Sequence, residues 1–353
     1  MRIKWADVLK GFGILFVVVG HIIPDGIPNT AGWDAIPTIP NSLIVSYIYS
    51  FHMPLFFFAS GYTYSMGKYK TWPSFLARHA KTIFIPFLFF LIVPYLYHLV
   101  FVALGQAGPI PWSDILGLLY ANGAHLGVLN ESLWFLPCLF LAQNLMWFCE
   151  PLSRKNLFIA WGVMTVLGWG LGRIFFPQEL PWSAITAFNG ASMMLAGQIF
   201  RKYEGWLAEK LKVETFPVAA ALGALGAVLC IVNGRINMPG NNYGRSYILY
   251  YLTVACTLLF YIWAAKRLAN SKFFVWLGAN SIIIFGLHGT VMNFWNTIDV
   301  YGFIGRAFNF TIDPLSRLVL ESFIVVATLI PCVLAINRHL PFCVGKGFGK
   351  KAI

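Results

Sequence analysis

Charged residues are scarce in this sequence. Asp, Glu, Lys and Arg make up 11% of its 353 residues, whereas 58% of the residues are hydrophobic and the mean hydropathy is +0.70. Such a composition excludes an ordinary soluble domain. Acidic residues are fewer than basic ones, 13 against 25, but the cations lie in short connections beside apolar segments. We therefore expect their partner to be a lipid bilayer and not nucleic acid.

The signatures of several enzyme classes are missing as well. No Gly-rich loop precedes a Lys-Ser or Lys-Thr pair, and neither HExxH nor GxSxG occurs, which excludes the P-loop, zinc-protease and hydrolase motifs. The cysteines form no CxxC pair, so we expect buried thiols and no metal. Because no internal repeat or separate soluble segment is evident, we expect one membrane-embedded domain over residues 1–353.

Long apolar runs are abundant instead. Many of them reach about 17 to 25 residues, which is enough to cross a hydrocarbon core of about 30 Å. They predict an all-α polytopic membrane protein with about ten transmembrane helices. The expected spans are residues 8–24, 43–65, 82–104, 133–150, 157–175, 184–200, 217–233, 246–265, 280–297 and 317–337. The first run lacks a small-x-small cleavage site after Gly20, which favours a retained helix over a signal peptide.

The connections between these spans alternate in charge. Even-numbered connections such as 66–81 are rich in Lys and Arg, whereas 25–42 and 105–132 contain neither. The other odd-numbered connections hold only a few arginines: Arg173, Arg235, Arg245, Arg306 and Arg317. Since cytoplasmic connections carry the excess of Lys and Arg, we expect both termini in the cytoplasm. The expected location is the inner (plasma) membrane.

Three ionisable residues lie in the first apolar run. Asp7 and Lys10 have the i, i+3 spacing of a helical ion pair, and His21 follows eleven residues after Lys10. At about 100° and about 1.5 Å per residue, Lys10 and His21 share nearly one helix face, about 16 Å apart along the axis. Ionisable groups at such depth indicate function by default. Lys10 could hold an anion and His21 could accept a proton, although a packing histidine fits the pattern equally well.

Two further segments carry polar residues. One lies near the predicted cytoplasmic side and the other lies within the second span. Arg78 and Lys81, at i, i+3 spacing before the third span, both suit phosphate groups. The same two cations also fit the positive-inside rule. In the second span, His52 is either functional or a plain interface residue, and Ser60-Gly61 is typical of close helix packing.

The fourth and ninth spans carry the remaining candidates. Glu131 and Trp134 lie where the fourth span begins on the outer side. Trp134 fits an interfacial aromatic residue or a platform for a sugar ring, and Glu131 fits a ligand for a sugar hydroxyl or a solvated carboxylate. The ninth span begins near Asn280 and contains His288.

Five motifs, in this order and spacing, resemble acyltransferase family 3. They are Asp7-x-x-Lys10-Gly11 continuing to Gly20-His21, Met53-Pro54-Leu55-Phe56-Phe57-Phe58-x-Ser60-Gly61-Tyr62, Arg78-x-x-Lys81, Leu133-Trp134-Phe135-Leu136-Pro137, and Gly278-x-Asn280-Ser281-Ile282 ending in His288. The similarity runs from residue 2 to about residue 290. Its nearest group is the fucose O-acetyltransferase group of integral membrane sugar acetylases.

This resemblance implies transfer of an acyl group, usually acetyl from acetyl-CoA, to a hydroxyl of a carbohydrate or lipid-linked glycan. It implies that His21 is catalytic and that Lys10, Arg78 and Lys81 form the coenzyme site. Glu131, Trp134 and His288 are then the candidates for acceptor binding. The chain departs from the commonest family pattern in having Lys at positions 10 and 81, where Arg is usual. It also lacks the appended hydrolase-like domain of some members, so transfer must be completed within the membrane domain.

The expected mechanism places the phosphates of acetyl-CoA at the cytoplasmic cations while the thioester arm threads between the helices. His21 then acts as general base on the acceptor hydroxyl or as a transient acyl carrier. A glycan or glycolipid exporter is the alternative, because many spans with intramembrane ionisable residues also fit a transporter. The absence of an evident inverted repeat weakens that alternative.

Overall fold

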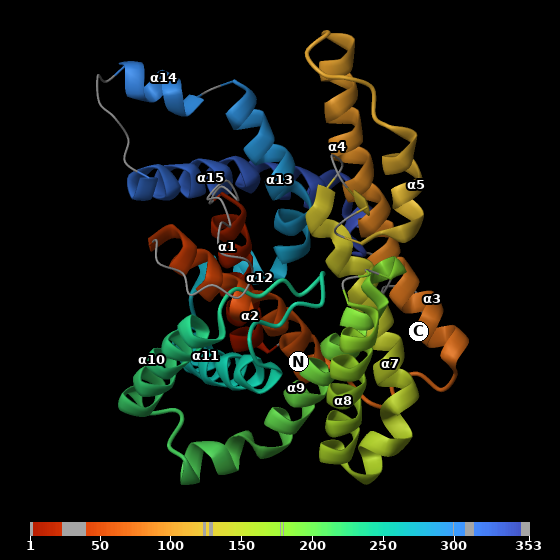
Figure 1. The fold of residues 1–353 in the computed structure, drawn as a ribbon, viewed down its shortest axis with the longest axis vertical. Coiled ribbons are helices and arrows are strands. Elements are labelled where there is room, and N and C mark those ends of the chain that lie inside the picture. Colours follow the sequence, from red (N-terminus) through yellow and green to blue (C-terminus); the bar gives the residue numbers. More distant parts are fainter. Residues whose placement is uncertain are drawn as a thin grey trace.

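The computed structural model describes residues 3–22, 40–122, 125–126, 130–176, 178, 180–298, 300–307 and 314–346. Within these ranges the regular structure is helical and contains no strand (Figure 1). The predicted all-α fold is therefore confirmed. The apolar runs form helices because a bilayer leaves backbone N–H and C=O groups no partner outside the segment itself.

Eleven helices or helix segments carry most of the fold. They are α1 (Lys4–Ile22), α2 (Pro40–Thr63), α3 (Trp72–His79), α4 (Ile85–Ala103), α7 (Phe135–Lys155), α8 (Leu157–Phe175), α9 (Ala184–Lys210), α10 (Phe216–Asn233), α11 (Tyr247–Arg267), α13 (Ser281–Thr297) and α15 (Pro314–His339). A π-helical turn, η1 (Ala80–Phe84), joins α3 to α4. The shorter elements are α5 (Trp112–Tyr120), α12 (Lys272–Ala279), α14 (Val300–Ala307), and the 3₁₀ turns η2 (Glu131–Trp134), η3 (Pro181–Ser183) and η4 (Pro341–Val344).

Each of the ten predicted spans falls on a helix, but fewer than ten qualify as spans. Among the described residues, 8 helices are long and apolar enough to cross a membrane, and the bent pair α12 and α13, at 78°, would be a ninth. The remaining predicted span, 184–200, falls on α9, which packs against α2, α7 and α8 (Figure 1). Among its buried polar side chains, Ser192 bonds to Thr165 of α8, whereas Thr186 and Asn189 bond to Asn241 and Tyr243 of the connection between α10 and α11. An interior helix can carry such groups because protein partners satisfy them.

Two close helix contacts depend on glycine. A Cβ atom on Gly61 of α2 would overlap the backbone of Met194 in α9, which confirms that the Ser60-Gly61 pair serves packing. A Cβ atom on Gly278 of α12 would overlap the carbonyl oxygen of Asp7 in α1. The second contact joins two of the family-like motifs, since it places the α12–α13 bend beside the turn of α1 that carries Asp7 and Lys10.

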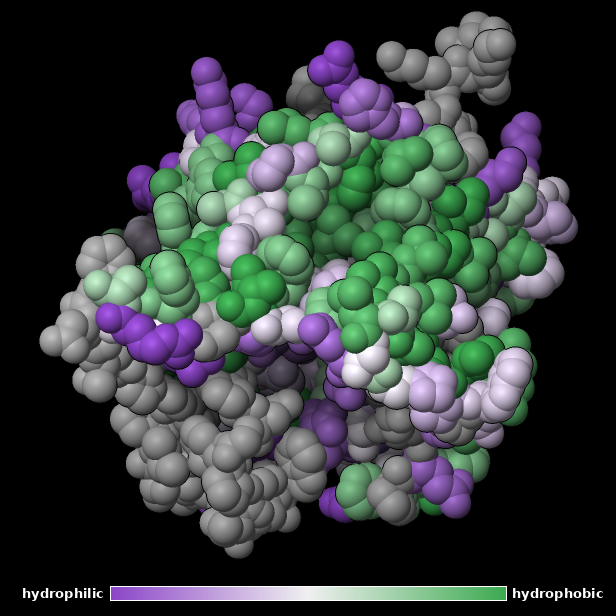
Figure 2. All heavy atoms as spheres, turned by 90° about the horizontal axis from the view of Figure 1, so that it is seen from above, coloured by the Kyte–Doolittle hydropathy of each residue, from purple (hydrophilic) through white to green (hydrophobic). Residues whose placement is uncertain are grey.

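The outer surface is strongly apolar. Large hydrophobic side chains are exposed on several outward-facing helices, for example Leu88, Leu96, Ile174, Val228, Ile248, Val319 and Phe323. Figure 2 shows a broad hydrophobic area bordered by hydrophilic residues. Side chains so exposed need lipid contact, because in water they would form one large unpartnered patch. The chain is a multi-pass membrane protein.

Candidate functional site

His21 lies at the last turn of α1 and is held by two hydrogen bonds. Its Nδ1 lies 2.8 Å from the carbonyl oxygen of Val17, and its Nε2 lies 3.2 Å from Oγ of Ser132 in η2. A carbonyl oxygen can only accept, so Nδ1 carries the proton and Nε2 carries the lone pair. The Ser132 hydroxyl therefore donates to Nε2. The structure thus presents the basic nitrogen of His21 to a hydroxyl group, which is the geometry that a general base requires.

His288 of α13 lies against His21. The two imidazole rings are edge to face with their centroids 4.9 Å apart. The side chain of His288 is fully buried, and its Nδ1 donates to the Phe285 carbonyl oxygen at 2.7 Å. Its Nε2 has no hydrogen-bond partner among the residues that the structure describes. A buried acceptor without a partner costs about 1 to 3 kcal/mol, so this nitrogen is suited to a polar group that arrives with a ligand.

A third histidine and an arginine complete the polar cluster. His52 of α2 is buried and donates from Nδ1 to the Ile48 carbonyl oxygen at 2.8 Å. The ring of Tyr49 lies between His52 and His21, at centroid distances of 5.1 and 6.2 Å. The guanidinium of Arg235, from the connection between α10 and α11, lies 5.9 Å above the Tyr49 ring. Residues from α1, α2, η2, α13 and this connection therefore meet at one end of α1.

The segment that enters α7 contributes a residue that the sequence analysis did not single out. Asn130 donates to the carbonyl oxygen of Gly286 at 3.1 Å and so ties η2 to α13. Glu131 is exposed, whereas Trp134 is only 7% exposed and packs edge to face with Phe135. The residue between them that reaches His21 is Ser132. Sequence reasoning missed it, because the two partners are 111 positions apart and a single hydroxyl before an apolar run carries no signal of that contact.

Lys10, the first of the predicted coenzyme cations, lies toward the other end of α1. Lys10 forms the expected ion pair with Asp7, with Nζ 2.9 Å from Oδ1. Arg78 lies in the last turn of α3 and Lys81 lies in η1, so the pair does not precede the third helical span as expected. It lies inside one helical segment of 32 residues, Trp72–Ala103, whose hydrogen-bond pattern changes at η1. Such π turns occur frequently at functional sites.

A further cation reaches this region from the C-terminal segment. Nζ of Lys346 donates to the Oδ1 atoms of Asn280 and Asn337, at 3.0 and 2.5 Å. The neighbouring Gly345 packs against the backbone of Thr82 in η1. From the sequence, Lys346 is only one of the cations that favour a cytoplasmic C-terminus. Its position in the structure ties the α12–α13 bend to the segment that carries Arg78 and Lys81.

Lys10 and His21 are linked by one continuous helix. No break interrupts α1 between Lys10 and His21, so the rise of about 1.5 Å per residue keeps them about 16 Å apart along the axis. One helix thus presents an ion-paired ammonium near one end and a hydrogen-bonded imidazole at the other. This arrangement suits a long ligand that carries charge at one end and reacts at the other.

Comparison with known families gives one assignment. Residues 3–337 match the model of acyltransferase family 3, described as an acyltransferase domain. The match covers nearly the whole chain and includes all the segments that meet around His21. Neither the curated proteins nor the solved structures contain a significant match.

Proposed function

Because the chain belongs to this acyltransferase family, we propose that it is a membrane O-acetyltransferase that moves acetyl from acetyl-CoA to a hydroxyl of a cell-surface or lipid-linked carbohydrate. Within the family, we propose that it belongs to the fucose O-acetyltransferase group. One observation carries the proposal: the lone pair of His21 Nε2 faces a hydroxyl group, with the unpartnered Nε2 of His288 beside it. Both features suit an acceptor that offers more than one hydroxyl.

In the proposed reaction His21 is the general base. The acceptor hydroxyl takes the position of the Ser132 hydroxyl and gives its proton to Nε2 while its oxygen attacks the thioester carbonyl. The resulting tetrahedral intermediate collapses with cleavage of the carbon–sulfur bond. The imidazolium then returns the proton to the coenzyme thiolate, which leaves as the thiol. His288 accepts a hydrogen bond from a second acceptor hydroxyl and so orients the sugar.

The protein prepares this step by fixing the imidazole rings. The backbone carbonyl of Val17 holds the tautomer in which Nε2 of His21 is basic, in the way that an orienting partner does in other base-catalysed sites. Residues around the rings, such as Val17, Val18 and Leu133, are buried and apolar. These apolar side chains limit the access of water to the partly exposed His21, which favours transfer over hydrolysis of the acyl donor.

The coenzyme is proposed to enter from the opposite end of α1. Its phosphates meet Arg78, Lys81 and Lys10, and Lys346 extends the same group of cations. The positive-inside rule places this end, and both termini, in the cytoplasm of a cell with the protein in its inner membrane. The coenzyme arm then spans the axial gap of about 16 Å between Lys10 and His21.

Transfer across a closed bilayer tests the proposal. Proteoliposomes would hold radiolabelled acetyl-CoA on the side of residues 66–81 and a carbohydrate acceptor on the other side. We expect labelled ester on the acceptor, and none with the donor on the wrong side. Movement of unmodified glycan without acetylation would instead support an exporter and contradict the proposal.

The orientation has a separate test by cysteine labelling. In a variant without native cysteines, Lys70→Cys is expected to react with an impermeant thiol reagent only from the cytoplasmic side. A cysteine placed at Gly108, in the connection predicted to face outward, provides the opposite control. Reaction of Lys70→Cys from outside would move the proposed coenzyme entrance to the other face.

A further inference from the structure

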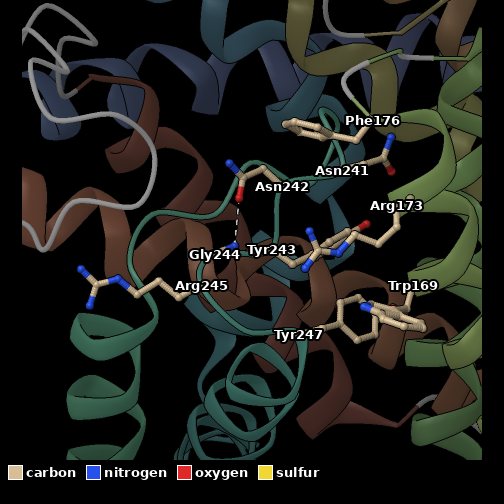
Figure 3. A pocket seen from close by; sticks show the side chains of 10 residues that line it. Trp169, Arg173, Phe176, Asn241, Asn242, Tyr243, Gly244, Arg245 and Tyr247 are labelled. Carbon is tan, nitrogen blue, oxygen red and sulfur yellow. Dashed lines mark hydrogen bonds between the residues drawn. The ribbon is translucent and has the colours of Figure 1, made fainter.

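A cavity of about 410 Å³ lies away from the histidines, between the end of α8 and the connection of residues 234–246. Its lining includes Trp169, Arg173, Asn241, Tyr243 and Tyr247 (Figure 3). Figure 3 shows Arg173 extending from α8 toward the connection; Arg245 also lines the cavity, and its side chain extends on the far side of the connection from Arg173. The cavity is large enough for a monosaccharide unit and has both polar and aromatic walls.

The charge of this cavity is positive and unbalanced. Arg173 makes no hydrogen bond or ion pair within the part of the chain that the structure describes, and no acidic side chain is among the described residues that line the cavity. Burial raises the pKa of the Tyr243 phenol, so this wall stays neutral. On a connection predicted to face outward, a cation is disfavoured by the positive-inside rule. The guanidinium of Arg173 at this position is suited to bind a carboxylate or phosphate group.

The other walls suit a sugar ring. Trp169 is 48% exposed and offers an indole face one helical turn before Arg173. The amide oxygens of Asn241 and Asn242 accept hydrogen bonds from Thr186 and from the backbone of Gly244. Their amide nitrogens make no hydrogen bond to other described residues and are free to donate to hydroxyl groups. An aromatic face, amide donors and one free cation together favour an acidic sugar over a neutral one.

The connection that forms the wall is held in one conformation. Asn237 and Asn242 exchange backbone hydrogen bonds of 2.9 and 3.0 Å across it. At its base the side chain of Asn233 binds the backbone of Tyr243 and Ser246, each at 2.9 Å. The cavity is therefore preformed, which lowers the entropy cost of binding.

The same connection reaches the histidine cluster at its other end. Arg235 lies above Tyr49, whose ring is next to His21 and His52. One rigid segment thus borders both the cavity and the proposed acceptor position. We infer that the cavity is a second acceptor subsite, which binds an acidic saccharide unit while a hydroxyl of a neighbouring unit lies at His21. This inference rests on the proposed function and names the acceptor as an anionic glycan.

Binding of small saccharides to the intact protein tests the subsite. The probes are a disaccharide that contains glucuronic acid, glucose 1-phosphate, and a neutral glucose disaccharide, with the protein in bilayer discs of zwitterionic lipid. From one charge-assisted hydrogen bond we expect at least one acidic probe to bind about tenfold or more tighter than the neutral one. Arg173→Gln should abolish that preference, Arg173→Lys should keep part of it, and the matched control Arg306→Gln on α14 should leave it unchanged.

Equal binding of acidic and neutral probes, no binding of either, or an unchanged preference in Arg173→Gln would overturn the inference. Loss of acidic-probe binding in discs that contain anionic lipid would also overturn it, since a lipid phosphate would then be the occupant. His21→Ala separates this result from the proposed function. It should keep the preference for the acidic probe over the neutral one, which depends on Arg173, even if no acyl transfer is found for either protein.

Discussion

The two ends of α1 hold their polar groups in opposite ways. At the His21 end, His52 and His288 are buried, and each of the three imidazoles is fixed by a hydrogen bond to a backbone carbonyl of its own helix. Of the cations proposed for the docking end, Lys10 and Arg78 are partly exposed and Lys81 is exposed. A reacting base needs a fixed tautomer, whereas phosphates that arrive from water need cations that water can reach. The difference indicates a chemical end and a docking end.

The largest expected effect concerns the chemical end. Replacing His21 by Ala removes the base, and we expect acyl transfer to fall by about 10² to 10⁴-fold. His339→Ala, an exposed histidine in the last turn of α15, is the matched control and should retain full activity. The measurement is the initial rate of labelled acetyl transfer, with membrane insertion checked for each variant. Near-normal transfer by His21→Ala would remove the catalytic assignment.

The next effect concerns the docking end. Arg78→Ala or Lys81→Ala should weaken acetyl-CoA binding by about 1.5 to 3 kcal/mol, or about tenfold to a hundredfold, if each makes a charge-assisted hydrogen bond to phosphate. Lys70→Ala, an exposed cation of the same connection, is the control and should bind normally. Titration of purified protein measures the difference. If all three variants bind alike, Arg78 and Lys81 act only as topology signals.

At the docking end, Gly278 of α12 packs against the backbone of Asp7 in α1. Breaking this contact should lower the stability of the protein, with a smaller effect than the two changes above. Gly278→Ala forces a methyl group onto the Asp7 carbonyl, and we expect a loss of about 1 to 3 kcal/mol from overpacking. At Gly289 in α13 an added methyl group would meet no atom within 4 Å, so Gly289→Ala is the control. Thermal unfolding in detergent compares the two. Equal stability would show that α1 and α12 can separate without cost.

The smallest effect distinguishes two roles for Ser132. If its hydroxyl only occupies Nε2 of His21 until the acceptor arrives, Ser132→Ala should reduce transfer by no more than about tenfold, as expected for a neutral hydrogen bond. The measurement is the transfer rate over a range of acceptor concentrations. A loss as large as that of His21→Ala would contradict this role and indicate that Ser132 itself carries the acyl group.

The sequence predicted those features that depend on local spacing. The helices, the Asp7–Lys10 ion pair and the separation of Lys10 from His21 along one helix are confirmed, since each depends on residues within a few turns. The roles assigned to Glu131 and Trp134 remain predictions. In the structure, Ser132 is the residue of that segment that contacts His21.

Features that depend on distant segments could not be predicted in the same way. The position of His288 beside His21 and that of Lys346 at Asn280 are set by the 78° bend between α12 and α13 and by the packing of the C-terminal segment on η1. The span expected at 184–200 falls on α9, which is not apolar enough to be counted among the spans; that its polar side chains are buried against protein neighbours follows from its packing on α2, α7 and α8 and not from its sequence. In both cases tertiary contacts decide what local composition cannot.

Acetyl-CoA binding by two variants tests most directly whether the His21 end and the Lys10 end of α1 have separate functions. Acetyl-CoA binding would be measured for His21→Ala and Arg78→Ala in parallel, under identical conditions. We predict that His21→Ala binds the coenzyme as tightly as the parent although it does not transfer acetyl, whereas Arg78→Ala binds it at least about tenfold more weakly. The opposite pattern, with binding lost in His21→Ala and kept in Arg78→Ala, would contradict the division of α1 into a chemical end and a docking end.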